Sequence, residues 1–222
     1  MSLWSLTLYV SLFMLPDARD LPLAGTAAVV IGRSFLHTGL FILAHDAMHG
    51  TLIPTFPKAN DWAGRIILGI YSMLSFEKLA ECHHQHHRTP AQASDPDYYS
   101  GGFWAWYFKF MQNYIQGRQG AVIFWGMSFL FYPLLFVFHV PLINAALFWL
   151  LPQALSSWQL FYFGTYRPHK PPAGGHTNAH RANSSQVSPF WSFLSCYHFD
   201  YHWEHHQYPH LPWYKLPSVH NR

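Results

Sequence analysis

The stretches HHQHH at residues 83–87 and HWEHH at residues 202–206 each carry three histidines at the spacing i, i+3, i+4. A third stretch, HDAMH at residues 45–49, carries two histidines at the spacing i, i+4. On a helix, these spacings place the imidazoles of each stretch on one face, about one turn apart. The eight histidines are His45, His49, His83, His86, His87, His202, His205 and His206. Three such faces can close around metal, because imidazole suits iron, copper, nickel and zinc.

The composition around these stretches is that of a membrane protein. Half of the 222 residues are hydrophobic, 19% are aromatic and 10% are charged, whereas about 25% are charged in a typical soluble domain. The net charge of +3 comes from scattered Lys and Arg without a basic stripe, so a nucleic-acid partner is not indicated. The two cysteines, Cys82 and Cys196, lie near histidine stretches and form no disulfide framework, so both are expected to be reduced thiols. No break in composition divides residues 1–222, and we expect a single domain.

Four apolar segments are candidates for transmembrane helices. They are residues 1–15, 23–44, 121–139 and 142–166. The second runs for about 22 positions, long enough to cross a hydrocarbon core of roughly 30 Å. The first lacks a basic n-region and a cleavage site, so we expect a membrane helix there rather than a signal peptide. Two shorter apolar segments, residues 62–76 and 103–115, are expected to lie in the membrane interface.

The side of the membrane follows from the loops. A shared metal requires all three histidine stretches to lie on one side, where the loops also hold most of the Lys and Arg residues, against Arg19 alone between the first two segments. We therefore predict an all-α, polytopic membrane protein with about four transmembrane helices, interfacial helices and a cytoplasmic histidine-rich cap.

Eight histidines exceed the needs of one metal ion. A structural site takes about four ligands, and a catalytic zinc site about three plus water. The surplus indicates two ions, and iron is favoured because O2 chemistry is a common use of an open imidazole site, although geometry alone does not name the metal. The sequence contains no HExxH, the signature of zinc proteases, and haem is usually bound by single axial histidines. A membrane metal-binding or transport protein stays an alternative, but it predicts more polar residues within the apolar segments than this sequence contains.

The pattern HxxxH, HxxHH, HxxHH with four apolar segments resembles the membrane di-iron desaturase and hydroxylase superfamily. Four strings resemble its bacterial-type β-carotene ketolases: LFILAHDAMHG (40–50), DPDYY (95–99), QLFYFGTYRPHK (159–170) and FWSFLSCYHFDYHWEHHQYPHLPWYKLP (190–217). The resemblance implies that the eight histidines bind two Fe2+ ions and that a ninth ligand exists. His169 is the first candidate for it, with an interfacial histidine as the alternative role. His180 and His198 compete for the ninth place, and His84 is a candidate for an outer contact.

The resemblance also implies an activity. A β-carotene 4-ketolase would use O2 to hydroxylate the ring C4 methylene twice, and loss of water would leave a ketone, giving echinenone and canthaxanthin. The carotenoid would reach the site from the lipid bilayer. Since no cytochrome domain or flavin motif occurs, a ferredoxin-like electron donor is expected on the cytoplasmic face. The alternatives within the superfamily are an acyl-lipid desaturase and a carotenoid ring hydroxylase.

Two further sets of residues are candidates for supporting roles. Carboxylates within or beside the histidine stretches can accept the distal N–H of a ligating imidazole. They are Asp46, Asp95, Asp97, Asp200 and Glu204, with a turn around Pro96 as the alternative role of the second and third. Aromatic residues near the last two stretches either line a substrate channel or serve as packing and interfacial anchors. They are Trp158, Phe161, Phe163, Tyr166, Phe190, Phe193 and Tyr197.

Overall fold

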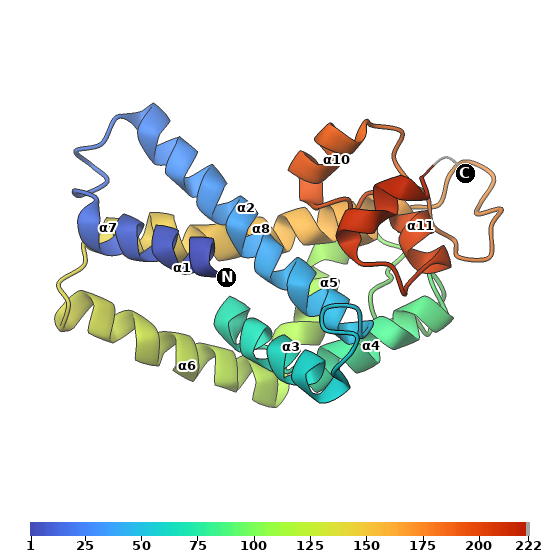
Figure 1. Cartoon of the computed structure of the whole chain (residues 1–222), viewed down its shortest axis with the longest axis horizontal. Coiled ribbons are helices and arrows are strands. Elements are labelled where there is room, and N and C mark those ends of the chain that lie inside the picture. The colour runs from blue at the N-terminus through green and yellow to red at the C-terminus, as the bar shows by residue number, and fades with distance from the viewer. Residues whose placement is uncertain (221–222) are drawn as a thin grey trace.

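The computed structural model describes residues 1–220, and within that range the chain is helical with no strand (Figure 1). Every apolar segment expected to be a transmembrane helix is helical. The helices are α1 (Ser2–Tyr9) with the π-helical turn η1 (Val10–Met14), α2 (Leu23–Met48), α6 (Gly117–Phe136), and the consecutive elements α7 (Leu142–Ala145), η2 (Ala146–Leu150), α8 (Leu151–Phe161), η3 (Tyr162–Tyr166) and α9 (Arg167–His169). The expected all-α class is thus confirmed.

Two of these helices, α2 and α6, are long and apolar enough to cross a membrane. They differ in their surroundings. Helix α2 lies at the centre of the molecule and buries side chains along its whole length, whereas α6 buries none. The large apolar side chains of α6, such as Phe124, Trp125 and Phe129, are exposed. Such an apolar surface is suited to contact with lipid.

Three helices between α2 and α6 support the histidine stretches. They are α3 (Pro57–Ser72), α4 (Phe76–Arg88) and α5 (Phe103–Ile115). The last has the bounds expected for an interfacial segment. Helix α3 begins five residues earlier than the predicted segment 62–76, because Pro57 suits the first turn of a helix, and it ends where Met73 adopts a left-handed conformation with φ 54°. Ser75 then caps α4 by accepting a hydrogen bond from the Lys78 backbone N–H at 3.3 Å.

The carboxyl-terminal part consists of shorter helices, α10 (Pro189–Cys196), α11 (His202–Gln207) and the 3-10 helix η4 (Trp213–Ser218). Tyr197 and His198 have φ of 51° and 65°, so the chain turns sharply between α10 and α11. His198, a candidate for the ninth ligand, lies in this turn, whereas His202 begins α11.

Buried polar side chains join the helices at the end of the molecule away from the histidines. In α2, the Arg33 guanidinium is 2% exposed and donates through Nη1 to the Trp4 carbonyl at 2.8 Å and through Nε to the Phe148 carbonyl at 3.3 Å. Asn144 in α7 accepts a hydrogen bond from the Ala18 N–H at 2.8 Å and donates to the Pro16 carbonyl at 3.0 Å. These contacts tie α1, α2 and the segment from α7 to α8 together.

Candidate metal centre

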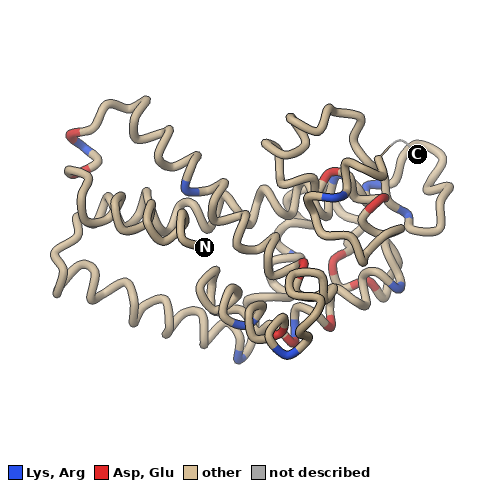
Figure 2. The backbone as a smooth tube through the Cα atoms, in the orientation of Figure 1, with Lys and Arg blue, Asp and Glu red and all other residues tan. Residues whose placement is uncertain are grey.

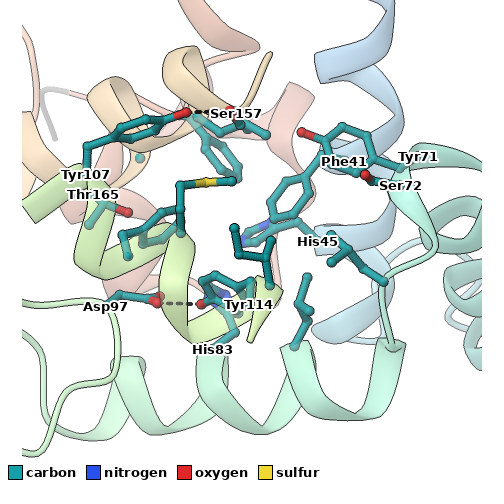
Figure 3. A pocket seen from close by; sticks show the side chains of 18 of the residues that line it. Phe41, His45, Tyr71, Ser72, His83, Asp97, Tyr107, Tyr114, Ser157 and Thr165 are labelled. Carbon is teal, nitrogen blue, oxygen red and sulfur yellow. Dashed lines mark hydrogen bonds between the residues drawn. The ribbon is translucent and has the colours of Figure 1, made fainter. Parts of the chain in front are cut away.

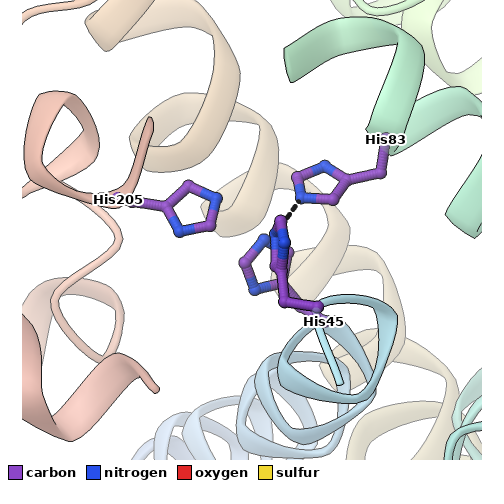
Figure 4. A group of neighbouring side chains, drawn as sticks. His45, His83 and His205 are labelled. Atoms are coloured by element: carbon purple, nitrogen blue, oxygen red, sulfur yellow. Dashed lines mark hydrogen bonds between the residues drawn. The ribbon is translucent and has the colours of Figure 1, made fainter. Parts of the chain in front are cut away.

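Histidines from four helices meet at one end of the molecule. Helix α2 extends through the HDAM of its histidine stretch, so His45 lies on its last turn and His49 follows at its carboxyl end. Helix α4 carries the second stretch, α9 carries His169, and α11 carries the third stretch. Figure 4 shows His45, His83 and His205 directed toward one another from α2, α4 and α11. We call the nine converging side chains the histidine cage: His45, His49, His83, His86, His87, His169, His202, His205 and His206.

The cage contains a first group made of His45, His49, His83 and His205, whose nitrogen atoms lie within 4.8 Å of one another. His87 joins this group, because its Nε2 is 3.1 Å from Nε2 of His83 and 2.9 Å from Nε2 of His205. Nε2 of His49 lies 2.8 Å from Nε2 of His83. The first group therefore offers five imidazole nitrogens.

A second group contains His86, His169, His202 and His206, all of them buried. Nε2 of His202 lies 2.9 Å from Nε2 of His169 and 3.1 Å from Nε2 of His206. Nε2 of His206 is also 3.2 Å from Nε2 of His86. The second group therefore offers four imidazole nitrogens, and His169, the first candidate for a ninth ligand, is one of them.

The nitrogen separations fit two metal ions. At metal–nitrogen bond lengths of about 2.0–2.1 Å, neighbouring ligands of one ion lie roughly 2.8–3.4 Å apart at angles between 90° and the tetrahedral value. The Nε2 separations of 2.8–3.2 Å match this range. Hydrogen bonds between imidazoles do not explain the cluster, because Nε2 of His83 and Nε2 of His202 each approach two other Nε2 atoms and a ring nitrogen has one proton or one lone pair to offer. A cation held in each group would satisfy all of these nitrogens at once.

The protonation state of the cage also suits metal binding. Burial lowers the pKa of His205 and His206 well below the ordinary value, and the neighbouring imidazoles lower it further. Neutral imidazole is the form that binds metal.

Two outer contacts orient rings of the second group. Nδ1 of His86 donates to a carboxylate oxygen of Asp95 at 2.9 Å, and Nδ1 of His169 donates to the Arg181 carbonyl at 2.9 Å. With the proton on Nδ1, the Nε2 lone pair of each ring faces the cage. Asp95 thus has the contact expected of a supporting carboxylate. It also makes the expected turn, since it accepts the backbone N–H of Asp97 at 2.9 Å.

The other four carboxylates accept no hydrogen bond from a cage histidine within the described residues, and their supporting role stays a prediction. Of the four, Asp97 comes near the cage, with an oxygen within 4.8 Å of a ring nitrogen of His86 and of an oxygen of Asp95. Asp46 lies 4.0 Å from Nδ1 of His45, too far for a hydrogen bond. The remaining three bind neighbouring loops and helices: Asp97 accepts from the Tyr114 hydroxyl, Asp200 from the hydroxyls of Ser185 and Ser192, and Glu204 from the Ser184 hydroxyl and from Nδ1 of His220. These contacts hold the segments around the cage rather than its imidazoles.

The three remaining candidate histidines lie outside the cage. Nε2 of His84 is 3.0 Å from the Met48 carbonyl oxygen. Nδ1 of His198 is 3.0 Å from the Ser192 hydroxyl, and its ring stacks on Tyr201. His180 comes closest, with its ring centroid 5.8 Å from that of His206, but its Nε2 binds Gln207 at 2.9 Å.

A cavity of about 320 Å³ begins at the cage and runs between helices (Figure 3). His45, His83, His86 and His202 form its polar end. Most of the remaining wall is apolar and includes Phe41, Leu79, Phe110, Met111, Leu160 and Phe199. The cavity therefore presents an apolar space directly beside the converging nitrogens.

The seven aromatic residues expected to line a channel do not line this cavity, and their role in a channel stays a prediction. Trp158 and Phe190 are exposed, Phe161 packs against the aromatic rings of α5, and Tyr197 stacks on Phe35. Phe163, Tyr166 and Phe193 also pack against other aromatic rings. The alternative role as packing and interfacial residues describes them better.

Helix α5 supplies part of the wall that the sequence analysis missed. Tyr107, Phe110, Met111 and Tyr114 all line the cavity. Their spacing of i, i+3, i+4 and i+7 identifies one face of a helix, and this periodicity was the available signal.

Comparisons with known proteins agree with this arrangement. The sequence model of the fatty acid desaturase family matches residues 21–126 and 102–222. A β-carotene ketolase of Paracoccus sp. (strain N81106 / MBIC 01143) is 37% identical over 219 residues, covering 96% of this chain and 86% of that protein. A β-carotene ketolase of Haematococcus lacustris is 40% identical over 199 residues, covering 86% of this chain and 61% of that protein. A zeaxanthin 4-ketolase of Chlamydomonas reinhardtii is 40% identical over 202 residues, covering 88% of this chain and 44% of that protein. No solved structure matches the chain.

Proposed function

Because this chain belongs to the fatty acid desaturase family and, within it, to the β-carotene ketolases, we propose that it is a β-carotene 4-ketolase. The observation that carries the proposal is the apolar cavity that ends at the histidine cage. A carotenoid ring has no charge and few polar atoms, and such a cavity buries it without leaving polar groups unpaired.

The cage would hold two iron ions, one in each group of histidines. Bound iron supplies the reductive activation of O2 that hydroxylation of a C–H bond requires. The five nitrogens of the first group and the four of the second are the ligands that we propose. The contacts of His86 with Asp95 and of His169 with the Arg181 carbonyl keep the Nε2 lone pairs of these two rings available.

The residues of the cavity would position the ring and exclude water. Phe41, Leu160 and Phe199 contribute apolar wall close to the cage histidines, so the ring methylene can lie against the cage while the polyene follows the apolar part of the cavity. Two hydroxylations at C4 give a geminal diol, and loss of one water leaves the ketone.

The proposal includes the position in the membrane. The four apolar segments would cross the bilayer, α3 and α5 would lie in the interface, and the cage would lie on the cytoplasmic side. The carotenoid would reach the cavity from the lipid, and a ferredoxin-like protein would deliver the electrons. The exposed apolar surface of α6 supports contact with lipid.

The test is pigment analysis of β-carotene-producing cells that express the chain. We expect echinenone or canthaxanthin with the wild type and none with His86→Ala or His205→Ala, which each remove a nitrogen from one group. His210→Ala is the matched control, because His210 is exposed and lies outside the cage in the same stretch of sequence. Retained ketone in either cage variant would refute its role as a ligand.

A carotenoid ring hydroxylase or an acyl-lipid desaturase would use the same cage. A hydroxylase would stop at the alcohol in the same cells, and a desaturase would leave the carotenoid unchanged and add a double bond to an acyl chain. The absence of any ketocarotenoid with the wild type would therefore refute the ketolase.

A further inference from the structure

Beyond α4, the exposed charge of the described chain is of one sign, whereas α4 itself exposes Glu77 and Glu81 as well as Arg88. Between residues 88 and 220, every exposed charged side chain is a cation and every carboxylate is buried. The exposed cations are Arg88, Lys109, Arg118, Arg167, Lys170, Arg181 and Lys215, and the buried carboxylates are Asp95, Asp97, Asp200 and Glu204. Figure 2 shows blue and red segments together at the α11 end of the molecule, so burial decides which sign reaches the surface there.

Three of these cations directly follow a histidine that belongs to the cage or lies beside it. Arg88 follows His87, Lys170 follows His169, and Arg181 follows His180. A hydrogen bond of 3.2 Å from Nη1 of Arg181 to the Ala91 carbonyl joins the loop of Arg181 to the segment after α4. We call Arg88, Lys170 and Arg181 the cationic rim.

At the rim, aromatic rings connect a cage histidine with side chains near the surface. The half-buried His180 has its ring centroid 5.8 Å from that of His206 and 6.2 Å from that of Trp203, which is also half-buried. The ring of His206 in turn stacks on that of His87 at 4.2 Å. A chain of π-systems thus leads from the rim to ligands of both groups.

The rim lies apart from the cavity. His87, His169 and His206 contribute nothing to the cavity wall, which is formed by other cage histidines. Between Lys170 and Ser188, a stretch that is fully described, no large hydrophobic side chain is exposed. Binding to a lipid surface needs apolar anchors beside the cations, so this surface suits a soluble anionic protein better than a membrane.

We propose that an acidic one-electron carrier protein docks on the cationic rim and that electrons pass through His180 and Trp203 to the cage. The proposal rests on the proposed function, because each hydroxylation consumes one O2, two electrons and two protons and yields one C–OH group and one water. Two reduced carriers supply the two electrons and leave oxidised. Opposite charge accelerates such encounters and makes them sensitive to salt.

The test measures binding of a plant-type [2Fe–2S] ferredoxin to the iron-loaded chain in phosphatidylcholine nanodiscs. The double variant Arg88→Glu/Lys170→Glu reverses two rim charges and spares Arg181, whose side chain binds Ala91. Lys109→Glu/Arg118→Glu is the matched control, because it changes the net charge equally at exposed positions on α5 and α6. We expect Kd to rise by about tenfold or more in the rim variant and to stay unchanged in the control.

Each other outcome overturns the proposal. An equal Kd for the rim variant and the wild type removes the rim as the docking surface. A rim variant that binds ferredoxin normally but loses binding to phosphatidylglycerol vesicles assigns the rim to lipid headgroups. Failure of the proposed function is a separate result, since it requires that the wild type forms no ketone with any reductant, including dithionite, whereas Kd is measured without turnover.

Discussion

Nitrogen atoms from distant parts of the chain approach one another in the cage at separations that imidazoles alone do not favour. Nε2 of His202 lies about equally close to Nε2 of His169 and of His206, at 2.9 and 3.1 Å. Such an arrangement is stable only with a cation between the lone pairs or with rings that rotate away. When metal is absent, the orientation of the cage imidazoles therefore depends on the hydrogen bonds of their outer nitrogens.

Asp95 is the outer contact whose loss is easiest to measure. One carboxylate oxygen of Asp95 accepts from Nδ1 of His86 and from the Ala91 N–H at 2.9 and 2.8 Å, and the other accepts from the Asp97 N–H at 2.9 Å. Asp95→Asn replaces one of these oxygens by an NH2 group, so one acceptor and the negative charge beside His86 are lost. We expect iron affinity to fall by roughly 10- to 100-fold, as for other outer contacts of metal sites. Titration of the iron-free protein with Fe2+ under anaerobic conditions measures the change.

Glu81→Gln is the matched control for this substitution. Glu81 is an exposed carboxylate on the same helix as His86, so the variant removes one negative charge without touching an imidazole contact. Equal iron affinities of the two variants would mean that Asp95 acts only through its charge.

The cage also predicts how the stability of the iron-free protein depends on pH. Burial lowers the pKa of His49 to about 4, and His205 shifts in the same direction. Between this value and the ordinary value of about 6.5, the unfolded chain binds protons that the folded chain does not, so stability falls as the pH falls. The slope is up to about 1.4 kcal/mol per pH unit for each such histidine. A melting temperature of the iron-free protein that stays constant from about pH 7.5 to about pH 5 would contradict this account.

At the scale of elements, the packing of α3 against α4 positions the second histidine stretch. Gly64 in α3 faces Phe76 at the start of α4, and a Cβ at this position would overlap the Phe76 ring. In Gly64→Ala, α4 must shift or the ring must move, which costs about 1–3 kcal/mol of unfolding free energy. Since α4 carries three cage histidines, we also expect weaker iron retention.

Gly69→Ala is the control on the same helix. A Cβ at Gly69 meets nothing within 4 Å, so only the higher helix propensity of alanine remains, and it stabilises by up to about 1 kcal/mol. Thermal unfolding and iron content of the two variants check the prediction. A Gly64→Ala protein as stable and as iron-rich as Gly69→Ala would show that α4 is not positioned by this contact.

The elements that the sequence predicted well are those with long apolar runs or regular histidine spacing. Helix α5 has the predicted bounds, and α2 and α6 lie within a few residues of theirs, because hydrophobic length and periodicity are local properties. The left-handed turn at Tyr197 and His198 was missed, since nothing in YHFD marks such a turn and neither residue is glycine. That turn separates His198 from the cage.

At the scale of the whole molecule, the cage was predictable and the cavity was not. The spacing of each histidine stretch predicts that its imidazoles lie on one face of a helix. Binding of a shared metal then requires the three faces to meet. The wall of the cavity depends instead on which side of each aromatic helix turns inward. Leu160 lines the cavity, whereas its neighbour Phe161 packs against α5. This difference is determined by tertiary packing and not by the local sequence.

Filling the cavity tests whether substrate binds there. Ala154 in α8 lines the cavity at an exposed position, so Ala154→Trp would obstruct the space from its outer side. We expect ketone formation to fall by about tenfold or more with unchanged iron content, because the ring no longer reaches its position. Ala121→Trp, at an exposed site on α6 outside the cavity wall, is the control. Equal ketone yields from both variants would place the substrate elsewhere.

Two irons, one in each group of the cage, would give the protein a fixed metal content. Inductively coupled plasma mass spectrometry measures this content on purified protein that forms ketone, and we expect two iron atoms per chain. Ketone-forming protein that contains no stoichiometric iron, or a single zinc ion in its place, would contradict this expectation.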